Sequence, residues 1–368
     1  MNVLLISYGI KEYDGRLTEI YNVAKKIGDV TLVCCGNSKC SNVKEKIVDV
    51  NKSKYLSLRL YISFLLTCLK AAKEMGGIDI LFSDNLFASI PALIIRKLFK
   101  PKVIVQDVRE LYFYKDIKNI SGRLFCKYET VLMKKSDVVL CANYHRSKIM
   151  FEQHKLKTFP LVFENIRFLT GEYDKKVLDE KYSNCFKYKV NIVSTGGLSV
   201  LRTTDKLVFA MTKLSNDYGL YIIGDGTDED NRIIQYIIDT NNLTNVMLIP
   251  KVPLEELRYI VQRCDIGIVS YHKKDLNNKY CASGKVYEYL AEGLPIVTTE
   301  NLPLKDLCVK YGVGESDDCF YKGIVKVSNN MSDYRQRVES YVSSISVDKN
   351  NSKIACEILK IINSEVIT

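Results

Sequence analysis

The residues best suited to chemistry lie in one short stretch, CASGKVYEYLAEGLPIV, at positions 281–297. Its turn of small residues ends with Ser283 and Gly284, and we expect a helix to begin near Lys285. The first turn of a helix leaves N–H groups unpaired, so such a turn can bind phosphate, and Lys285 adds a positive charge there. Glu288 follows on the same helix face, where its carboxylate can accept hydrogen bonds from ligand hydroxyls. The stretch therefore predicts a site for a phosphorylated, hydroxylated ligand.

Two further turns in the second half of the chain could contact phosphate. In STGGLSVLRTTD, at 194–205, two glycines precede an arginine, whose planar guanidinium suits a diphosphate. The turn IIGDGTDEDN, at 222–231, could equally be a tight connection with an acidic helix cap. The residues concerned are Gly196, Gly197, Arg202, Gly224, Asp225 and Gly226. For the 281–297 stretch, the alternative is an ordinary helix start with a solvated Lys–Glu pair.

The first half offers acidic side chains rather than glycine turns. Asp107 and Glu110 lie at or just after the end of the apolar run KVIVQD, and ligands bind beyond the carboxyl ends of parallel strands. Each carboxylate could orient an acceptor or stabilise positive charge, or could serve only as a cap or ion-pair partner. His145 and His272 also follow apolar runs, but a lone histidine is more often structural than catalytic.

The apolar pattern predicts the strands and helices that position these residues. Ten short apolar runs rich in β-branched residues indicate buried parallel strands, which need not alternate in polarity. They occupy 3–7, 30–35, 78–83, 102–107, 137–142, 190–195, 219–224, 245–250, 265–270 and 294–299. Helical patterns separate them, over 16–27, 55–75, 86–99 and 121–135 in the first half. This alternation predicts two doubly wound α/β domains.

Length and polarity divide the chain into parts. At about 150 residues per domain, 368 residues suggest two domains. We expect a first domain over 1–170, a polar linker over 171–188 and a second domain over 189–349. The remaining 350–368 should form an amphipathic helix that is free to pack back on the first domain.

Composition excludes several classes of protein. The twelve cysteines are scattered without a CxxC pair, and the N-terminus lacks the pattern of a signal peptide, so we expect a reduced, cytoplasmic chain. The longest apolar stretches, 60–69 and 86–95, are about half of the ~20 residues that cross a bilayer. No zinc-finger or RNP-type signature supports binding of nucleic acid.

Positive charge is concentrated in the first half. Residues 1–170 hold 28 Lys and Arg against 16 Asp and Glu, whereas the remainder holds 25 against 27. The cations stand beside aliphatic and aromatic residues in 55–73, 93–102 and 122–135. Such surfaces can bind anionic lipid head groups, which would place the protein peripherally on the inner face of the plasma membrane. Solvated faces of core-packed helices are the alternative.

The order and spacing of these motifs resemble a known family. Gly196 with Arg202, the GDG turn, PKVPLEELRYIVQRCDIGIVSY (250–271) and SGKVYEYLAEGLPIVTT (283–299) resemble the carboxyl-terminal domain of GT-B glycosyltransferases. More specifically, they resemble the large retaining family with nucleotide-sugar donors, glycosyltransferase family 4. In the first half, 10–27, 103–112 and 127–143 are also similar to it. The resemblance implies a GT-B fold, in which two Rossmann-like domains face each other across a cleft. It also implies that the first domain, 1–170, binds the acceptor and that the second, 189–349, binds the nucleotide sugar.

The resemblance also implies roles for single residues. Gly196, Arg202 and Lys285 would meet the donor diphosphate, and Glu288 would hold the ribose. Gly15 and Arg16 would form an amino-domain loop over the phosphates, and Asp107 and Glu110 would face the reacting sugar. The chain departs from the family at Gly197, where an Arg is common, at Tyr280, where an acidic residue is frequent, and in lacking a His at Asp107 or Glu110.

The implied activity is transfer of a sugar from a nucleotide diphosphate sugar to a glycan or lipid-linked acceptor, as in surface polysaccharide synthesis. Fixed cations can stabilise the leaving diphosphate, and no DxD triplet lies at a strand end, so we expect neither a metal nor a cofactor. A GT-B sugar-nucleotide 2-epimerase and a non-catalytic nucleotide-sugar-binding partner protein remain alternatives. A nicotinamide-dependent dehydrogenase is disfavoured, because the first strand is followed by SYGIKEYDG rather than GxGxxG.

Overall fold

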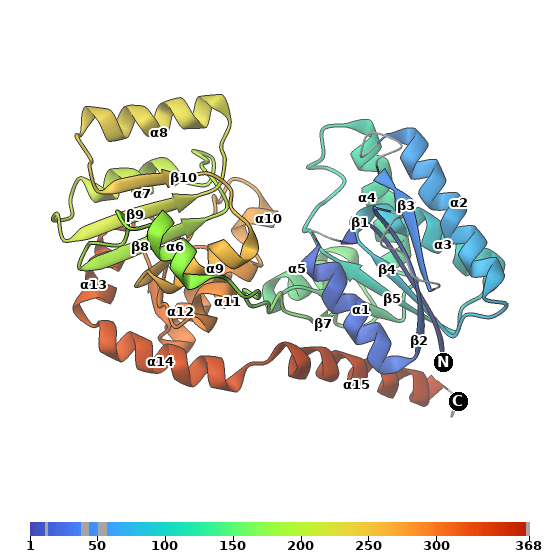
Figure 1. The fold of residues 1–368 in the computed structure, drawn as a ribbon. Coiled ribbons are helices and arrows are strands. Elements are labelled where there is room, and N and C mark those ends of the chain that lie inside the picture. The colour runs from blue at the N-terminus through green and yellow to red at the C-terminus, as the bar shows by residue number, and fades with distance from the viewer. Residues whose placement is uncertain (12–13, 38–43, 51–56, 366–368) are drawn as a thin grey trace. The chain divides into compact units, whose positions relative to one another are not determined.

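The computed structural model describes residues 1–11, 14–37, 44–50 and 57–365, which form two compact units (Figure 1). Unit 1 comprises Met1–Asn165 and Val347–Thr368, and unit 2 comprises Ile166–Ser346. The sequence predicts a division near residue 170, whereas the units divide after Asn165. Glu12, Tyr13 and the first two residues of the helix expected over 55–75 lie outside the described residues.

The sheet of unit 1 is entirely parallel, and its strand order is β3-β2-β1-β4-β5-β6-β7. Its strands are β1 (Asn2–Ile10), β2 (Asp29–Gly36), β3 (Glu45–Asp49), β4 (Ile80–Asp84), β5 (Val103–Val108), β6 (Val138–Cys141) and β7 (Leu161–Val162). Five of the seven coincide with apolar runs that predicted strands. The short edge strands β3 and β7 were not predicted.

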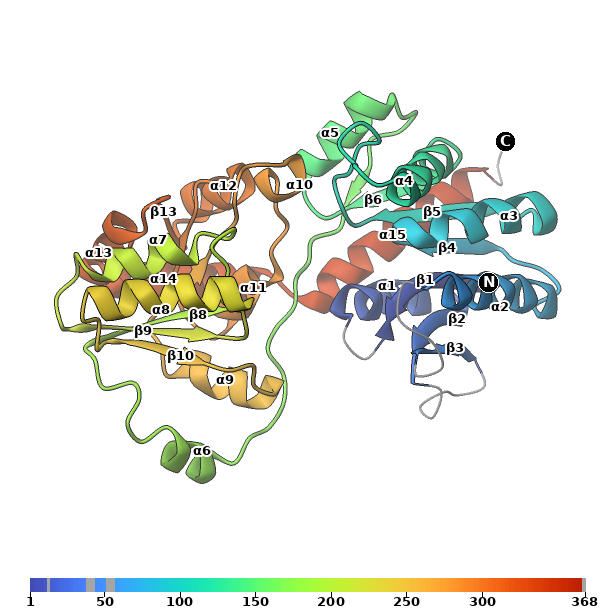
Figure 2. The same ribbon diagram turned by 90° about the horizontal axis from the view of Figure 1, so that it is seen from above.

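Helices cover both faces of this sheet, because successive strand residues point to opposite sides. On β1, Val3 and Leu5 pack with α1 and α15, whereas Leu4 and Ile6 pack with α2 and α3. The helical segments are α1 (Gly15–Ile27), α2 (Leu58–Glu74), the 3₁₀ turn η4 (Leu86–Ala88), α3 (Ser89–Phe99), α4 (Ile120–Met133), α5 (Tyr144–His154) and α15 (Val347–Glu365). The carboxyl-terminal α15 lies beside α1, 320 or more residues away in the chain (Figure 2).

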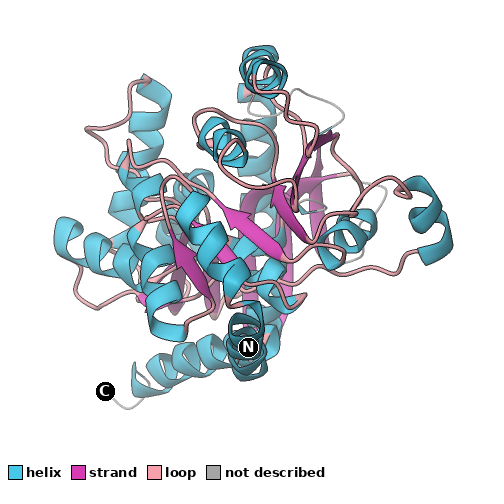
Figure 3. Cartoon of the chain, turned by 90° about the vertical axis from the view of Figure 1, so that its left-hand side faces the viewer, coloured by secondary structure: helices cyan, strands magenta, loops and turns pink. Residues whose placement is uncertain are grey.

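Unit 2 repeats the architecture with a parallel sheet of order β10-β9-β8-β11-β12-β13. Its strands are β8 (Val190–Thr195), β9 (Tyr218–Ile223), β10 (Val246–Ile249), β11 (Ile266–Val269), β12 (Ile296–Thr298) and β13 (Gly314–Ser316). The sequence predicted the first five. Strands in magenta with helices in cyan on their faces are visible in Figure 3.

Apart from the short α10, which has no buried residue, the helices of unit 2 pack on two separate apolar cores, one on each face of the sheet. They are α6 (Lys175–Lys181), α7 (Thr204–Met211), α8 (Asp228–Thr240), α9 (Leu254–Gln262), α10 (Leu276–Lys279), α11 (Gly284–Ala291), α12 (Leu302–Tyr311), α13 (Tyr321–Asn329) and α14 (Met331–Ser344). Helix α6 lies within the expected linker, and Leu178 and the following Tyr182 pack into the core of unit 2. Among the described residues, no helix combines the length and the apolar character needed to cross a membrane.

Candidate active site

Each sheet has one point where the strand order reverses direction, and ligands bind there in open α/β folds. In unit 1 this point lies between β1 and β4, and in unit 2 it lies between β8 and β11. The residues that follow these strands are therefore the first place to look for a site. Both points carry charged side chains in unusual arrangements.

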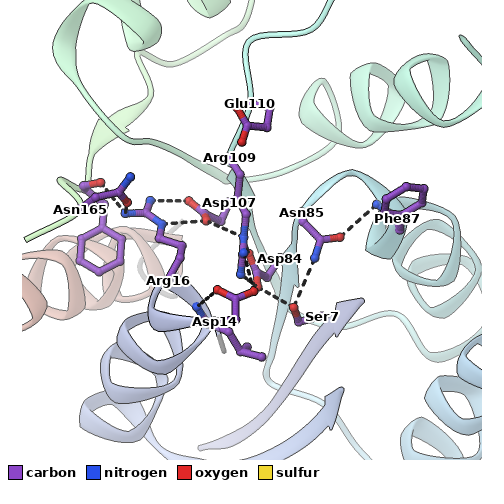
Figure 4. A network of polar contacts seen from close by, with 12 residues as sticks. Ser7, Asp14, Arg16, Asp84, Asn85, Phe87, Asp107, Arg109, Glu110 and Asn165 are labelled. Atoms are coloured by element: carbon purple, nitrogen blue, oxygen red, sulfur yellow. Dashed lines mark hydrogen bonds and ion pairs between the residues drawn. The ribbon is translucent and has the colours of Figure 1, made fainter. Parts of the chain in front are cut away.

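In unit 1 the switch point holds a buried network centred on Arg109 (Figure 4). Its guanidinium makes a paired contact with Asp84 at the end of β4, and its Nη1 donates to Asp14 Oδ2 over 2.6 Å. Asp84, whose side chain is fully buried, also accepts a hydrogen bond from Ser7 Oγ at 2.7 Å. Asp14 caps α1 by accepting from the Leu17 N–H at 3.0 Å. Arg109 thus ties the start of α1 to strands β1 and β4.

A second arginine of unit 1, Arg16, forms an ion pair with Asp107. Arg16 donates to the two carboxylate oxygens of Asp107 over 3.0 and 2.6 Å, and its Nη1 donates to Phe163 O and Asn165 Oδ1 (Figure 4). The Asp107 side chain is only 1% exposed. Asp107 therefore positions Arg16, and the hydrogen bonds that the Arg16 guanidinium donates are made within unit 1. The neighbouring Gly15 begins α1.

Burial affects one acidic group of this network, Asp84. It raises the pKa of Asp84 to about 6, and the Arg109 guanidinium opposes that shift. The reason is that desolvation disfavours a charged carboxylate, whereas a nearby cation favours it. Glu110, predicted as a site residue, differs from Asp107 because its side chain is 49% exposed and 3.8 Å from Arg146 Nη1.

In unit 2 the glycine turn after β8 makes room for Lys285. Gly196 and Gly197 adopt positive φ angles of 96° and 91°, and both N–H groups donate to the Ile223 carbonyl. Those N–H groups are therefore already committed within the fold. A Cβ on Gly196 would lie 2.1 Å from Lys285 Nζ, so the glycine is required by the close approach of this side chain.

Lys285 is held on the first turn of α11. Its ammonium donates to the Thr195 carbonyl at the end of β8, over 2.5 Å. Four residues on, the hydroxyl of the fully buried Tyr289 accepts from the Thr195 N–H at 2.8 Å. The Tyr289 ring fits over β11 because Gly267 has no side chain. Two side chains of α11 thus fix its positive end at the switch point.

Two exposed guanidinium groups lie near Lys285. Arg202, after the glycine turn, lies over the Tyr271 ring with 5.5 Å between its Cζ and the ring centroid. Arg167 Nε lies 2.6 Å from Glu288 Oε1, and its guanidinium occupies the space above Gly284. Burial, together with repulsion from Arg202 and Arg167, lowers the pKa of Lys285 to about 8, and Glu288 opposes this. Three cations, Lys285, Arg202 and Arg167, therefore lie near a single carboxylate, that of Glu288. The surplus of positive charge suits a dianionic ligand.

The GDG turn supports the glycine turn by direct packing. A Cβ on Gly224 would meet the Gly197 N–H at 2.7 Å, and one on Gly226 would meet Leu198 Cβ at 2.8 Å. Asp225 accepts the Leu198 N–H through its carbonyl and the Lys251 N–H through its carboxylate. These three residues and Gly197 thus hold the loop in place. Ser283, at the N-cap of α11, is buried and makes no capping hydrogen bond with its side chain.

The structure thus unites some predicted residues and adds others. Gly196, Arg202, Lys285 and Glu288 come together in unit 2, whereas Gly15, Arg16, Asp107 and Glu110 lie in unit 1. Arg167 could not be predicted, because it lies in a stretch without helix or strand pattern, 121 positions before Glu288. Asp14, Asp84 and Arg109 follow or end the predicted first, third and fourth strands, but their pairing could not be read from the chain.

The space at Gly196 gives a direct test of this geometry. We expect Gly196→Ala to displace the Lys285 ammonium and to strain the turn, at a cost of about 1–3 kcal/mol for the positive φ. Anion binding should weaken about tenfold or more, as measured by calorimetric titration with nucleoside diphosphates. Gly293→Ala is the matched control, because Gly293 has φ +80° and nothing within 4 Å of a Cβ. Equal affinities in the two variants would contradict the assignment.

Comparison with known proteins addresses the fold. No protein-family model matches the chain, and no curated protein sequence matches it. Solved structures do match over nearly the whole chain. Anabaena HepE in complex with UDP has a TM-score of 0.70 and 13% identity, over 98% of this chain and 100% of its own. The chain has the GT-B fold.

Two other GT-B structures show that proteins with different descriptions share this architecture. The lipopolysaccharide outer core galactosyltransferase WaaB matches with a TM-score of 0.65 and 13% identity, over 97% of this chain and 99% of its own. A Listeria monocytogenes protein provisionally called a UDP-N-acetylglucosamine 2-epimerase matches with a TM-score of 0.62 and 10% identity, over 99% and 96%. The sequence prediction of a GT-B fold is confirmed, and the activity must be argued from the site.

Proposed function

We propose that this chain is a retaining, metal-independent glycosyltransferase that moves a sugar from a nucleotide diphosphate sugar to a glycan or lipid-linked acceptor in surface polysaccharide synthesis. The cluster of Lys285, Arg202 and Arg167 around the positive end of α11 carries the proposal. Three cations beside one carboxylate leave an excess of positive charge. Binding a diphosphate neutralises that excess, which is what a nucleotide sugar offers.

The cluster also supplies the chemistry that the transfer requires. When the bond to the anomeric carbon breaks, negative charge builds on the leaving diphosphate, and fixed cations stabilise it without reorganisation. Lys285 is held for this purpose by Thr195, and Glu288 is placed by Arg167 to accept the ribose hydroxyls. Arg202, which is exposed, completes the diphosphate contact. Three cations in these positions remove the need for a metal ion.

We propose supporting roles for the residues of unit 1. Asp107 holds Arg16 in place from below, and Gly15 begins the helix whose N-cap is Asp14. Arg16 lies in the first turn of α1 rather than in a loop, and we keep it as the candidate of unit 1 for a contact with the donor phosphates. Glu110 is the exposed carboxylate of the set, so we assign to it, rather than to Asp107, direct contact with the reacting sugar.

Incubation of the protein with nucleotide sugars in the absence of acceptor separates the activities that this fold can support. A glycosyltransferase should release nucleoside diphosphate and free sugar slowly, by transfer to water, and Lys285→Ala should abolish this. Interconversion of the donor to its 2-epimer would identify an epimerase instead. Tight binding with no turnover, even with glycan and lipid-linked acceptors, would identify a non-catalytic binding protein. HepE carries UDP, so UDP-sugars come first in the panel.

A basic and apolar surface of unit 1 supports a peripheral membrane location on the cytoplasmic side. On α2, Leu58, Ile62 and Leu66 recur every four residues and are 45–74% exposed. Helices α2, α3 and α4 lie side by side, and their exposed cations are Arg59, Lys70, Lys73, Arg96, Lys97 and Lys127. Co-sedimentation with phosphatidylglycerol vesicles but not phosphatidylcholine vesicles is expected, and Ile62→Ser with Leu66→Ser should reduce it. Equal binding to both vesicles would contradict this surface.

A further inference from the structure

Unit 1 contains a cavity of about 360 Å³ at the carboxyl ends of its central strands. Its walls include Asn85, Phe87, Arg109, Glu110, Tyr112 and Glu129. The volume lies in the range of small-molecule sites, which are mostly apolar with a few polar groups that fix orientation. Glu129, on α4, is not used by any contact described above.

We propose that this cavity receives an uncharged sugar ring of the acceptor, and that Glu129 contacts it as a carboxylic acid that donates a hydrogen bond to a ring hydroxyl. The inference rests on the proposed function, since it names the chemical class of the acceptor. Glu129 is then a specificity-determining residue, in addition to the residues predicted from the sequence.

Glu129 is buried without a counter-ion. It is 3% exposed, and within the described part of the chain its carboxyl makes no hydrogen bond or ion pair, although its backbone carbonyl accepts from Gln106. An isolated buried carboxylate is costly, so such a group either finds a partner or stays neutral. The cavity is the place where a partner can enter.

The charged groups around Glu129 do not neutralise the negative charge that its carboxylate would carry. The carboxylates of Glu110 and Asp107, at the end of β5, repel a negative charge there. Arg109, from the same segment, is paired with Asp84 and Asp14, while Arg16 is paired with Asp107. Arg146, from α5, donates to the Arg109 carbonyl. On its own helix, Cys126 shares the buried face with Glu129, and the hydroxyl-bearing Tyr112 and Tyr8 line the same cavity.

This environment keeps Glu129 protonated at neutral pH. Burial raises the pKa of Glu129 to about 8, and the Glu110 and Asp107 carboxylates add to the shift. A protonated carboxyl donates one hydrogen bond and accepts others, as a sugar hydroxyl can use. Above pH 8 the group becomes an acceptor-only carboxylate in a site that already holds Asp14 and Glu110.

The walls favour a neutral ring over an anionic one. Phe87 belongs to an aromatic cluster, with ring centroids 5.4 Å from Tyr8 and 4.9 Å from Phe125, so its position is fixed by packing. A flat aromatic wall suits the apolar face of a sugar. The lining contains three acidic side chains, Asp14, Glu110 and Glu129, and its one arginine is already paired. A phosphate or carboxylate on the ring would be repelled.

The test uses 4-nitrophenyl glycosides as probes and calorimetric titration of the full chain at pH 6.5 and 9.5. We expect at least one neutral probe (glucoside, galactoside, mannoside or N-acetylglucosaminide) to bind at pH 6.5, and the glucuronide, which adds one carboxylate, to bind at least tenfold more weakly than the glucoside. If only protonated Glu129 binds, affinity should fall roughly 30-fold at pH 9.5. Failure of every neutral probe, or equal binding of the glucuronide, would overturn the proposal.

Glu129→Gln separates this residue from other sources of pH dependence. The amide donates and accepts as the protonated acid does, so the variant should bind at pH 6.5 and lose most of the fall at pH 9.5. Glu152→Gln, the same change on the exposed face of α5, should keep the wild-type profile. A Glu129→Gln variant with an unchanged fall would also overturn the proposal. The wild-type comparison of glucoside with glucuronide needs no variant, so it decides even if Glu129→Gln fails to fold.

Unfolding provides a readout without any ligand. Because the pKa of Glu129 is raised, the folded protein binds a proton between about pH 4.5 and 8 that the unfolded chain does not bind. The contribution of Glu129 to the free energy of unfolding therefore falls as pH rises through this range. The melting temperature of Glu129→Gln should therefore rise relative to that of wild type as the pH is raised from 5 to 8. Binding of nucleoside diphosphate, measured on the same samples, tests the site in unit 2. It therefore tests the proposed function independently of the Glu129 cavity.

Discussion

Replacing Lys285 by methionine is expected to weaken nucleoside diphosphate binding by about 10- to 150-fold. The estimate corresponds to the 1.5–3 kcal/mol typical of a hydrogen bond to a charged group. Methionine keeps the length of the stem, so the Gly196 turn and the start of α11 should remain in place. The measurement is a calorimetric titration of wild type and variant with the same nucleotide.

The same variant should unfold at a temperature no lower than that of wild type. Burial and the two neighbouring arginines lower the pKa of Lys285 to about 8, which means that its charged form is disfavoured in the folded state. Below pH 8 that charge opposes folding, by about 1–3 kcal/mol before the lost Thr195 hydrogen bond is counted, and the penalty vanishes as pH rises toward 10.5. Loss of binding with retained stability would identify a site selected for its ligand. A variant that loses stability and keeps its affinity would show that Lys285 is structural.

Binding by wild type should also depend on pH in a defined direction. Because an anionic ligand favours the charged ammonium, affinity should change little between about pH 7, where the terminal phosphate with its pKa of about 6 is ionised, and pH 8, and it should fall as Lys285 loses its proton above pH 8. Lys285→Met should lack this fall, which serves as the internal control.

Replacing Arg109 by methionine is expected to destabilise unit 1 by about 3–5 kcal/mol, the cost of leaving buried carboxylates without their cation. Asp84 is fully buried and would keep only the Ser7 hydroxyl, and Asp14 would lose the contact that ties α1 to the strand ends. For a unit of this size, the melting temperature should fall by roughly 10 °C.

Two comparisons show whether the unpaired charge is the cause. The deficit should shrink as pH falls toward 6 and level off below it, because the pKa of Asp84 lies above its wild-type value of about 6 once Arg109 no longer opposes the effect of burial, so the variant takes up the proton first. The double variant Arg109→Met with Asp84→Asn should recover much of the loss. Arg96→Met, on the exposed face of α3, is the matched control and should change stability by less than about 0.5 kcal/mol. A small effect of Arg109→Met, or no recovery in the double variant, would refute the role given to the network.

The sequence predicts the central strands well because parallel strands are buried on both faces and read as continuous apolar runs. The strands that it misses lie at or near the sheet edges. Strand β13 is GES and has no apolar residue, and β3 and β7 contribute few buried side chains. Helix α6 was read as linker because only one of its residues, Leu178, is buried.

The site is less predictable than the strands because its contacts join distant segments. The 281–297 motif marks Lys285 and Glu288, since local spacing places them on one helix face. Nothing local marks Arg167 as the partner of Glu288, or Arg109 as the partner of Asp84. Glu129 had a usable signal, because it shares the buried face of α4 with Cys126, Leu132 and Met133 at helical spacing. A glutamate on such a face predicts a buried carboxyl.

The most direct test of the cation cluster is a paired titration of the wild-type chain with nucleoside diphosphates and the corresponding monophosphates of uridine, guanosine, cytidine and adenosine. The cluster of Lys285, Arg202 and Arg167 predicts that at least one diphosphate binds, at least tenfold more tightly than its monophosphate. At 100 times its dissociation constant it should raise apparent stability by about 2.7 kcal/mol. If no diphosphate binds, or if mono- and diphosphates bind equally, the cluster is not a diphosphate site and the proposed activity is wrong.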